Sequence, residues 1–231
     1  MLQVVAASVR GPAHLVAELP CQDAWASVVD ERGALAVVSD GMGSRPCADK
    51  GAKAAASAVC DAWLSWRQSP LASVEDLLGR VEAAWLRRLK AVPPDDAAAT
   101  CLFFAEDDQG RAVTAQIGDG IIVRRGSNRS VTAHPSLHLG FGMTHALGIP
   151  HDLGHWTYLQ AGPLEPGEAI LLATDGVADD LQEGRIGDLI DWVIAEFSPR
   201  RFPGRALAKE LRNWPVPRHQ DDKTLLILWK Q

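Results

Sequence analysis

The sequence lacks the features that mark several large classes of protein. No apolar run approaches the roughly 20 residues that a helix needs to cross a bilayer, and residues 1–10 do not have the pattern of a secretory signal peptide. The four cysteines form no C-x-x-C pair and show no spacing typical of structural zinc. We therefore expect a cytoplasmic protein with no membrane partner, whose cysteines are reduced and carry no chemistry.

Positive charge is also too sparse for a nucleic-acid-binding surface. The formal net charge is −6, and basic and acidic residues are interspersed along the chain. Attraction to a phosphate backbone requires a concentrated basic patch, so we expect no nucleic-acid partner. The chain has 231 residues, 47% of them hydrophobic, without a break in composition. This predicts a single domain over residues 1–231 with one large core.

Strand and helix patterns occur in blocks along the chain. Apolar runs rich in β-formers predict strands at residues 4–9, 24–29, 34–39, 100–105, 112–117, 121–124, 169–174 and 224–229. Helical spacing of apolar residues predicts helices at 47–67, 74–91, 186–197 and 204–213. Blocks of strands, then helices, then strands favour a layered α+β architecture over alternating βαβ units.

Local patterns also predict how these elements connect. The first strands are expected to pair as antiparallel neighbours, and the turns at 107–110 and 118–120 are expected to be hairpins. The first two helices are expected to lie as a pair against a sheet. Residues 134–155 have poor periodicity and predict a long surface loop, with His134, His138, His145 and His151 exposed and without a role. The eight tryptophans are expected to pack in the core and between helices.

The most informative pattern is a set of aspartates at the ends of predicted strands. Asp40, Asp119 and Asp175 each follow an apolar run and precede a glycine, while Asp221 lies just before the last strand. The glycine allows a sharp turn or a close approach to an ion. Carboxylate oxygens suit hard divalent cations such as Mg²⁺ and Mn²⁺. Taken singly, each aspartate is also a common turn or helix-cap residue; together they predict one metal site.

The order of these motifs resembles that of the metal-dependent (PPM, or type 2C) Ser/Thr protein phosphatases. The resemblance runs from residue 22 to 228 and includes Asp40-Gly-Met-Gly, Gly118-Asp-Gly, Asp175-Gly and Asp221-Asp-Lys-Thr. The segments Cys21-Gln-Asp-Ala and Gly11-Pro-Ala-His are similar to a bacterial branch of the family. The implied fold is a four-layer αββα sandwich of two antiparallel sheets flanked by helical pairs.

The implied activity is hydrolysis of phosphoserine or phosphothreonine in proteins by a water that bridges two Mn²⁺ or Mg²⁺ ions. The expected partners are therefore a phosphorylated protein and a Ser/Thr kinase that acts on the same targets, and a monomer is expected. By resemblance, Asp40 bridges the two ions, Gly41 offers its carbonyl oxygen, and Asp175 and Asp221 complete the inner ligands. Asp23 holds water at the site.

Two assignments remain open at this point. Asp119 and Asp179 match a weaker third metal site of the family, although a hairpin turn and a solvated helix residue explain them nearly as well. Asp222 takes the place of the asparagine that the family usually has after the last ligand. A shift of one residue would exchange Asp221 and Asp222.

Several positions depart from the family pattern. Glu18 stands where many members have an arginine that grips the substrate phosphate, and Gln22 replaces an acidic residue. Met42 stands where eukaryotic relatives carry a histidine, and a thioether cannot protonate a leaving group. We expect His14 to contact the substrate phosphate instead, with Arg10 as a second candidate.

Two alternatives to a protein phosphatase remain open, and the missing arginine and Gln22 support the first of them. One is a degenerate phosphatase that binds phosphoprotein or metal without turnover. The other is an enzyme of the same fold that hydrolyses a small phosphorylated metabolite. Phosphopeptide turnover separates both from the leading hypothesis.

Overall fold

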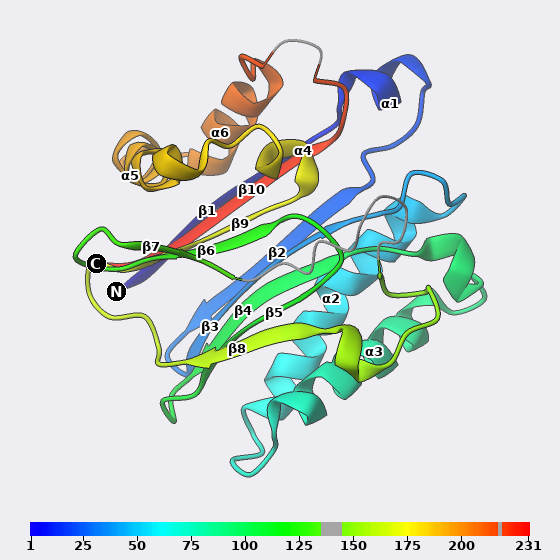
Figure 1. Ribbon diagram of the computed structural model, residues 1–231, viewed down its shortest axis with the longest axis horizontal. Coiled ribbons are helices and arrows are strands. Elements are labelled where there is room, and N and C mark those ends of the chain that lie inside the picture. Colours follow the sequence, from blue (N-terminus) through cyan, green and yellow to red (C-terminus); the bar gives the residue numbers. More distant parts are fainter. Residues whose placement is uncertain (135–144, 217–218) are drawn as a thin grey trace.

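The strands form two stacked antiparallel sheets. A computed structural model of the protein describes residues 1–134, 145–216 and 219–231. Sheet A has the order β1-β10-β9-β6-β7, and sheet B has the order β2-β3-β4-β5-β8 (Figure 1). The strands of sheet A are β1 (Leu2–Val9), β6 (Ile121–Arg125), β7 (Val131–Ala133), β9 (Ala169–Ala173) and β10 (Lys223–Lys230). Those of sheet B are β2 (Asp23–Asp30), β3 (Gly33–Asp40), β4 (Cys101–Asp107), β5 (Ala112–Ile117) and β8 (Thr157–Ala161).

Helices cover the outer face of each sheet. Two long helices, α2 (Ala48–Trp66) and α3 (Val74–Leu89), lie on sheet B, and α5 (Ile186–Phe197) and α6 (Pro203–Arg212) lie on sheet A (Figure 1). The shorter elements are α1 (Pro12–Val16), α4 (Asp175–Ala178), η1 (Pro94–Ala97), η2 (Leu153–His155) and η3 (Glu183–Arg185). The predicted α+β sandwich of two antiparallel sheets is therefore confirmed.

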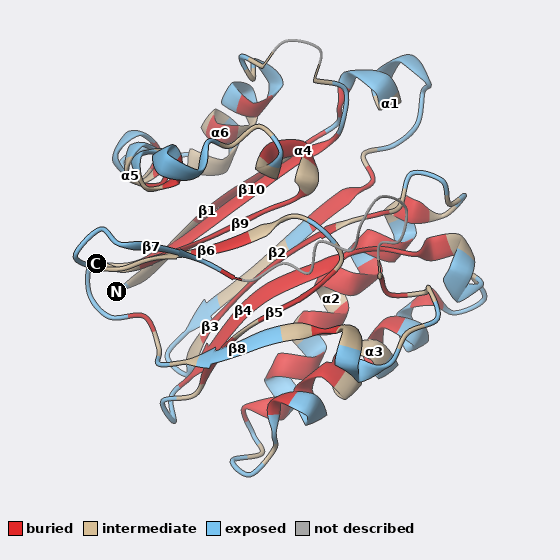
Figure 2. Ribbon diagram, in the orientation of Figure 1, coloured by how far each residue is buried: buried red, intermediate tan, exposed pale blue. Residues whose placement is uncertain are grey.

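The alternation of side chains along β3 explains the layering. Ala34, Ala36 and Val38 face the core between the sheets, whereas Leu35 and Val37 pack beneath the helical pair. Successive residues of a strand point to opposite faces, so a strand covered on both sides reads as a continuous apolar run. Figure 2 shows the inner strands of sheet B buried along most of their length, as β3 and β4 are, whereas β2 at the edge of the sheet is largely intermediate or exposed.

The tryptophans divide into two groups. Trp63, Trp66 and Trp85 are buried between the first helical pair and sheet B, as predicted. Their indole N–H groups are satisfied as well; Trp63 Nε1, for example, donates to the Glu106 carbonyl oxygen at 3.1 Å. The prediction is wrong for Trp25 and Trp192, which remain 39% and 43% exposed.

Two predicted strand pairings are wrong. β1 does not join its sequence neighbours but pairs along its whole length with β10, from Leu2 opposite Lys230 to Val9 opposite Lys223. The segment 118–120 is not a hairpin, because β5 and β6 belong to different sheets. Gly118 and Gly120 have φ angles of 97° and 100°, a region that favours glycine, and they let the chain pass from one sheet to the other.

Residues 145–155 form the predicted surface loop only in part. Ala146 and Leu147 are buried, and Leu147 exchanges two backbone hydrogen bonds with Ala99. His134 is also buried rather than exposed, with Nδ1 3.0 Å from Thr114 Oγ1 and Nε2 3.1 Å from the Thr157 carbonyl oxygen. The rest of the predicted loop, residues 135–144 with His138, lies outside the described residues. Among the residues described, no helix is long and apolar enough to span a bilayer.

Candidate metal centre

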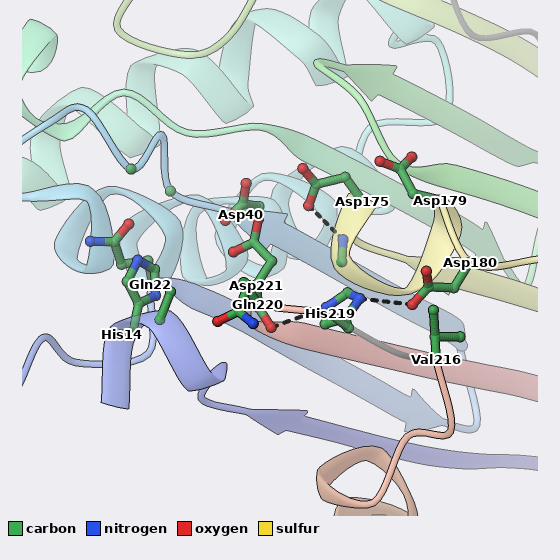
Figure 3. Close-up of a pocket in the computed structure, with 14 residues that line it drawn as sticks. His14, Gln22, Asp40, Asp175, Asp179, Asp180, Val216, His219, Gln220 and Asp221 are labelled. Carbon is green, nitrogen blue, oxygen red and sulfur yellow. Dashed lines mark hydrogen bonds and ion pairs between the residues drawn. The ribbon is translucent and has the colours of Figure 1, made fainter. Parts of the chain in front are cut away.

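Strand ends from both sheets meet around one pocket. The pocket has a volume of about 550 Å³, and Asp40, Asp175 and Asp221 are among the residues that line it (Figure 3). Asp40 ends β3 in sheet B, Asp175 follows β9 in sheet A, and Asp221 precedes β10. Three carboxylates that are far apart in the sequence are thus brought to one place.

Asp23 joins the two sheets below this pocket. It stands opposite Asp40 in the β2–β3 register and is only 5% exposed. Its Oδ2 accepts hydrogen bonds from the hydroxyls of Thr174 and Thr224, at 2.8 and 2.7 Å. Its Oδ1 is buried and has no hydrogen bond within the described part of the chain. The carboxylate is therefore held rigidly, with one oxygen still able to accept.

Close packing at glycines fixes the positions of Asp175 and Asp221. A Cβ on Gly176 would lie 1.9 Å from the Asp222 carbonyl oxygen, and one on Gly11 would lie 2.2 Å from that of Asp221. The backbone before β10 therefore passes between two glycines. No larger residue fits at either position without displacing the chain that carries Asp221.

Gly41 is held in place by the start of α2. A Cβ there would meet the Ala48 carbonyl oxygen at 2.3 Å. The Gly41 N–H donates to the Gln22 carbonyl oxygen at 3.1 Å, and the residue lines the pocket. The Asp-Gly pattern at the end of β3 is thus explained by packing as well as by access to the pocket.

Asp222 has a different role from that of Asp221. Its side chain is 1% exposed, and it accepts the backbone N–H groups of Gly11 and Gln22 at 2.6 and 2.5 Å. Asp222 Oδ2 also lies 2.9 Å from His14 Nδ1. The two adjacent aspartates therefore point to different places: Asp221 to the pocket, and Asp222 to the backbone around α1 and β2.

His14 lines the pocket (Figure 3). Its ring is oriented by Asp222. Among the described residues its Nε2 makes no hydrogen bond. Arg10, the second phosphate candidate, does not line the pocket; its Nη1 donates to the Leu19 carbonyl oxygen at 3.0 Å. Glu18 and Met42 do not line the pocket either.

The acidic residues are electrostatically coupled. Burial raises the pKa of Asp40 far above its ordinary range, and the charges of Asp23 and Asp175 raise it further. Burial, followed by the charges of Asp119 and Asp221, raises the pKa of Asp175 to about 7. Carboxylates with such raised pKa values retain protons unless a positive charge is brought among them.

The positions proposed for a third ion are adjacent to this cluster. Asp179 lines the pocket, whereas Asp119 does not. Loss of hydration and the charges of Asp179 and Asp221 raise the pKa of Asp119, although its side chain is accessible to solvent. Asp119 is thus close enough to the cluster to interact with it.

The donor chemistry fits hard divalent cations. Five aspartates line the pocket, and its lining contains no Arg or Lys in the described part of the chain. The buried oxygens Asp23 Oδ1 and Gln22 Oε1 lack hydrogen-bond partners there. Oxygen donors of this kind match Mg²⁺ or Mn²⁺. As the described side chains stand, however, no three of His, Cys, Asp or Glu converge closely enough to hold an ion.

A second histidine, which no sequence motif indicated, lies in the pocket. His219 lines it, with Nδ1 2.8 Å from Asp180 Oδ2 and Nε2 3.2 Å from the Asp221 carbonyl oxygen (Figure 3). Asp180 also accepts from Trp214 Nε1 at 2.9 Å. The only available signal was position, since His219 lies two residues before Asp221 and Asp180 follows Asp179.

Comparison with known proteins agrees with this arrangement. A family model described as protein phosphatase 2C matches residues 10–214. No curated protein sequence matches the chain.

Solved structures share the fold at low sequence identity. The photosystem II phosphatase PBCP has a TM-score of 0.71 and 15% identity, covering 100% of this chain and 99% of that one. The Ser-Thr phosphatase MsPP from Mycobacterium smegmatis, in complex with cacodylate, has a TM-score of 0.64 and 20% identity, covering 99% and 98%. The catalytic domain of the phosphatase PstP, solved with two manganese ions, has a TM-score of 0.65 and 17% identity, covering 98% and 97%.

The order of the aspartates and the family model, which matches most of the chain, agree. This chain belongs to the protein phosphatase 2C family.

Proposed function

We propose that this protein hydrolyses phosphoserine and phosphothreonine in proteins with the help of two Mn²⁺ or Mg²⁺ ions. The observation that carries the proposal is a pocket lined by five aspartates and by no Arg or Lys among the described residues. A phosphate dianion would be repelled from such a pocket unless cations neutralised it. The acidic lining therefore supports an enzyme that binds its substrate phosphate through metal.

Asp40, Gly41, Asp175 and Asp221 would hold the two ions, and Asp119 and Asp179 a weaker third. When bound, such ions acidify a water and neutralise the charge that develops on the phosphoryl oxygens. Asp23, whose Oδ2 is fixed by two threonine hydroxyls, accepts a hydrogen bond from the attacking water through Oδ1 and orients it. His14 Nε2 donates to a phosphate oxygen.

Hydrolysis of a phosphothreonine peptide tests the proposal. We expect phosphate release in the presence of Mn²⁺, complete loss with chelator, and a loss of at least about 100-fold in Asp175→Asn. Asp61→Asn is the matched control, because Asp61 is exposed and pairs with Arg88 on the outer helices. Activity that survived both chelator and Asp175→Asn would remove the metal mechanism.

One observation favours a second candidate, a degenerate phosphatase. Gln22 stands in the pocket where the family has an acidic residue, and its Oε1 has no hydrogen-bond partner in the described part of the chain. An amide oxygen coordinates more weakly than a carboxylate and cannot accept a proton. Mn²⁺ binding without turnover of any phosphopeptide would favour this candidate.

The remaining expectations complete the proposal. The whole chain acts as a single catalytic domain, as a monomer in the cytoplasm, on phosphoproteins produced by a Ser/Thr kinase. Gel filtration of the purified protein tests the oligomeric state.

A further inference from the structure

A second groove adjoins the acidic pocket. It has a volume of about 380 Å³ and runs along η3 and α5, where it is lined by Leu181, Arg185, Leu189 and Trp192. Asp180 lines both the pocket and this groove. The pocket and the groove therefore meet at Asp180, and a substrate with its phosphate in the pocket would enter the groove from there.

Trp192 is the largest apolar surface in this groove. The opposite face of α5 buries Ile186, Ile190 and Val193 against sheet A, which leaves Trp192 43% exposed. Its ring is held edge-to-face against Phe197, with ring centroids 5.2 Å apart and an interplanar angle of 86°. A rigid, half-exposed tryptophan is the kind of residue that dominates binding surfaces.

The charged groups of the groove are already paired. Arg185 Nε lies 2.7 Å from Asp188 Oδ2, and Asp180 Oδ2 contacts His219 Nδ1 and Trp214 Nε1. The groove therefore has little unpaired charge with which to select a partner. Its selectivity rests on the apolar surface of Leu181, Leu189 and Trp192.

The other half-exposed tryptophan provides a contrast. Trp25 is 39% exposed and lines a groove between β1, β2 and α6. That groove shares no lining residue with the acidic pocket. Of the two tryptophan grooves, the Trp192 groove is the one that shares a lining residue with the site proposed for phosphate.

From this adjacency we propose that the Trp192 groove binds the polypeptide that flanks the phosphorylated residue, through a large apolar side chain packed on Trp192. This inference rests on the proposed function and narrows it, since the preferred substrates are phosphoproteins with a bulky apolar residue near the phosphoserine or phosphothreonine. A small phosphorylated metabolite would leave the groove unused.

Matched phosphopeptides provide the test. A phosphothreonine peptide with glycine at all flanking positions is compared with peptides that carry one leucine, scanned through the four positions on each side. At the position that reaches Trp192 we expect kcat/KM to rise about tenfold, mainly through KM, because one large apolar side chain leaves water. The preference should persist in 0.5 M NaCl, because apolar contact is not screened by salt as charge pairing is.

Substitutions then test whether the leucine preference arises in the Trp192 groove. In Trp192→Ala and Leu189→Ala, kcat/KM for the leucine peptide should fall to within about twofold of that for the all-glycine peptide. Hydrolysis of a small aryl phosphate should stay unchanged. Trp25→Ala is the matched control and should keep the preference. The inference is overturned if no position shows a preference, if Trp192→Ala slows the aryl phosphate equally, or if Trp25→Ala has the same effect.

Failure of the proposed function would give a different result. If neither peptides nor aryl phosphate were hydrolysed, the same peptides would be titrated in the presence of Mn²⁺ and their binding measured by isothermal titration calorimetry. Tighter binding of one leucine peptide, lost in Trp192→Ala but not in Trp25→Ala, would support the groove without catalysis. Equal binding of all peptides would overturn it.

Discussion

Asp23 and Asp40 stand opposite each other at the ends of β2 and β3, as direct partners in the antiparallel register. Adjacent strands place partners of this kind within about 4.5–5.5 Å of each other, so the two carboxyl groups share one small, largely buried volume. Ionising both groups would place two repelling charges there, and this repulsion adds to burial in raising the pKa of Asp40. A divalent cation would remove this repulsion, which links the stability of the fold to metal binding.

The stability of the metal-free protein should depend on pH through Asp175. Its pKa rises from 3.8 to about 7 in the folded protein, so between these values the folded chain holds a proton that the unfolded chain has released. Stability falls as pH rises wherever the folded state binds more protons. We therefore expect the free energy of unfolding in urea to fall more steeply with pH in the wild type than in Asp175→Asn. A steeper fall in the variant would contradict the account.

The roles of Asp221 and Asp222 can be separated by one substitution in each. In Asp222→Asn, one of the two buried oxygens that accept backbone N–H groups becomes an NH₂ group, which cannot accept a hydrogen bond. This substitution should cost about 1–3 kcal/mol of stability. Asp221→Asn should leave stability nearly unchanged in metal-free buffer and weaken Mn²⁺ binding. Urea denaturation and Mn²⁺ titration of both variants measure this. The reverse pattern would mean that Asp222 is the ligand.

His14 and Arg10 are the two candidates for contact with the substrate phosphate. His14→Ala should raise KM for a phosphopeptide about tenfold, because a hydrogen bond to a charged group is lost. Arg10→Ala should change KM less than about twofold, since Arg10 already donates to the Leu19 carbonyl oxygen outside the pocket. Steady-state kinetics of the two variants decide between them. A larger effect in Arg10→Ala would assign the contact to Arg10.

The close packing of Gly176 predicts that alanine is tolerated far less well at Gly176 than at Gly184. A Cβ at Gly176 would meet the Asp222 carbonyl oxygen at 1.9 Å, whereas one at Gly184 would have nothing within 4 Å. Gly176→Ala should lose at least about 2 kcal/mol of stability, and Gly184→Ala should stay within about 0.5 kcal/mol of wild type. Thermal or urea denaturation compares them. Equal stability of the two variants would mean that this packing is not required.

Sequence patterning predicted the elements better than their pairing. The periodicity of α2, α3 and β3 depends only on local residues, so these elements were predicted within a few residues of their observed ends. The pairing of β1 with β10 joins the two ends of the chain, and no local pattern specifies it. The short β8 was missed because its exposed Tyr158 and Leu159 do not alternate regularly with buried residues.

The candidate site shows the same difference between features that local sequence specifies and features that depend on distant contacts. The Asp-Gly dipeptides drew attention to Asp40 and Asp175 because a strand, a carboxylate and a glycine are consecutive in the sequence. The function of Asp222 in holding Gly11 and Gln22 depends on contacts more than 190 residues apart in the sequence. His219 and Trp192 belong to no motif, and only the assembled fold shows that one lines the pocket and the other the adjoining groove.

Mn²⁺ binding measured by isothermal titration calorimetry, on the wild type and on Asp40→Asn and Asp175→Asn, tests the central claim most directly. We expect the wild type to bind two ions per chain and each variant to lose at least one of them. Wild-type protein that bound no Mn²⁺, or variants that bound it with unchanged stoichiometry and affinity, would contradict the metal centre proposed at this pocket.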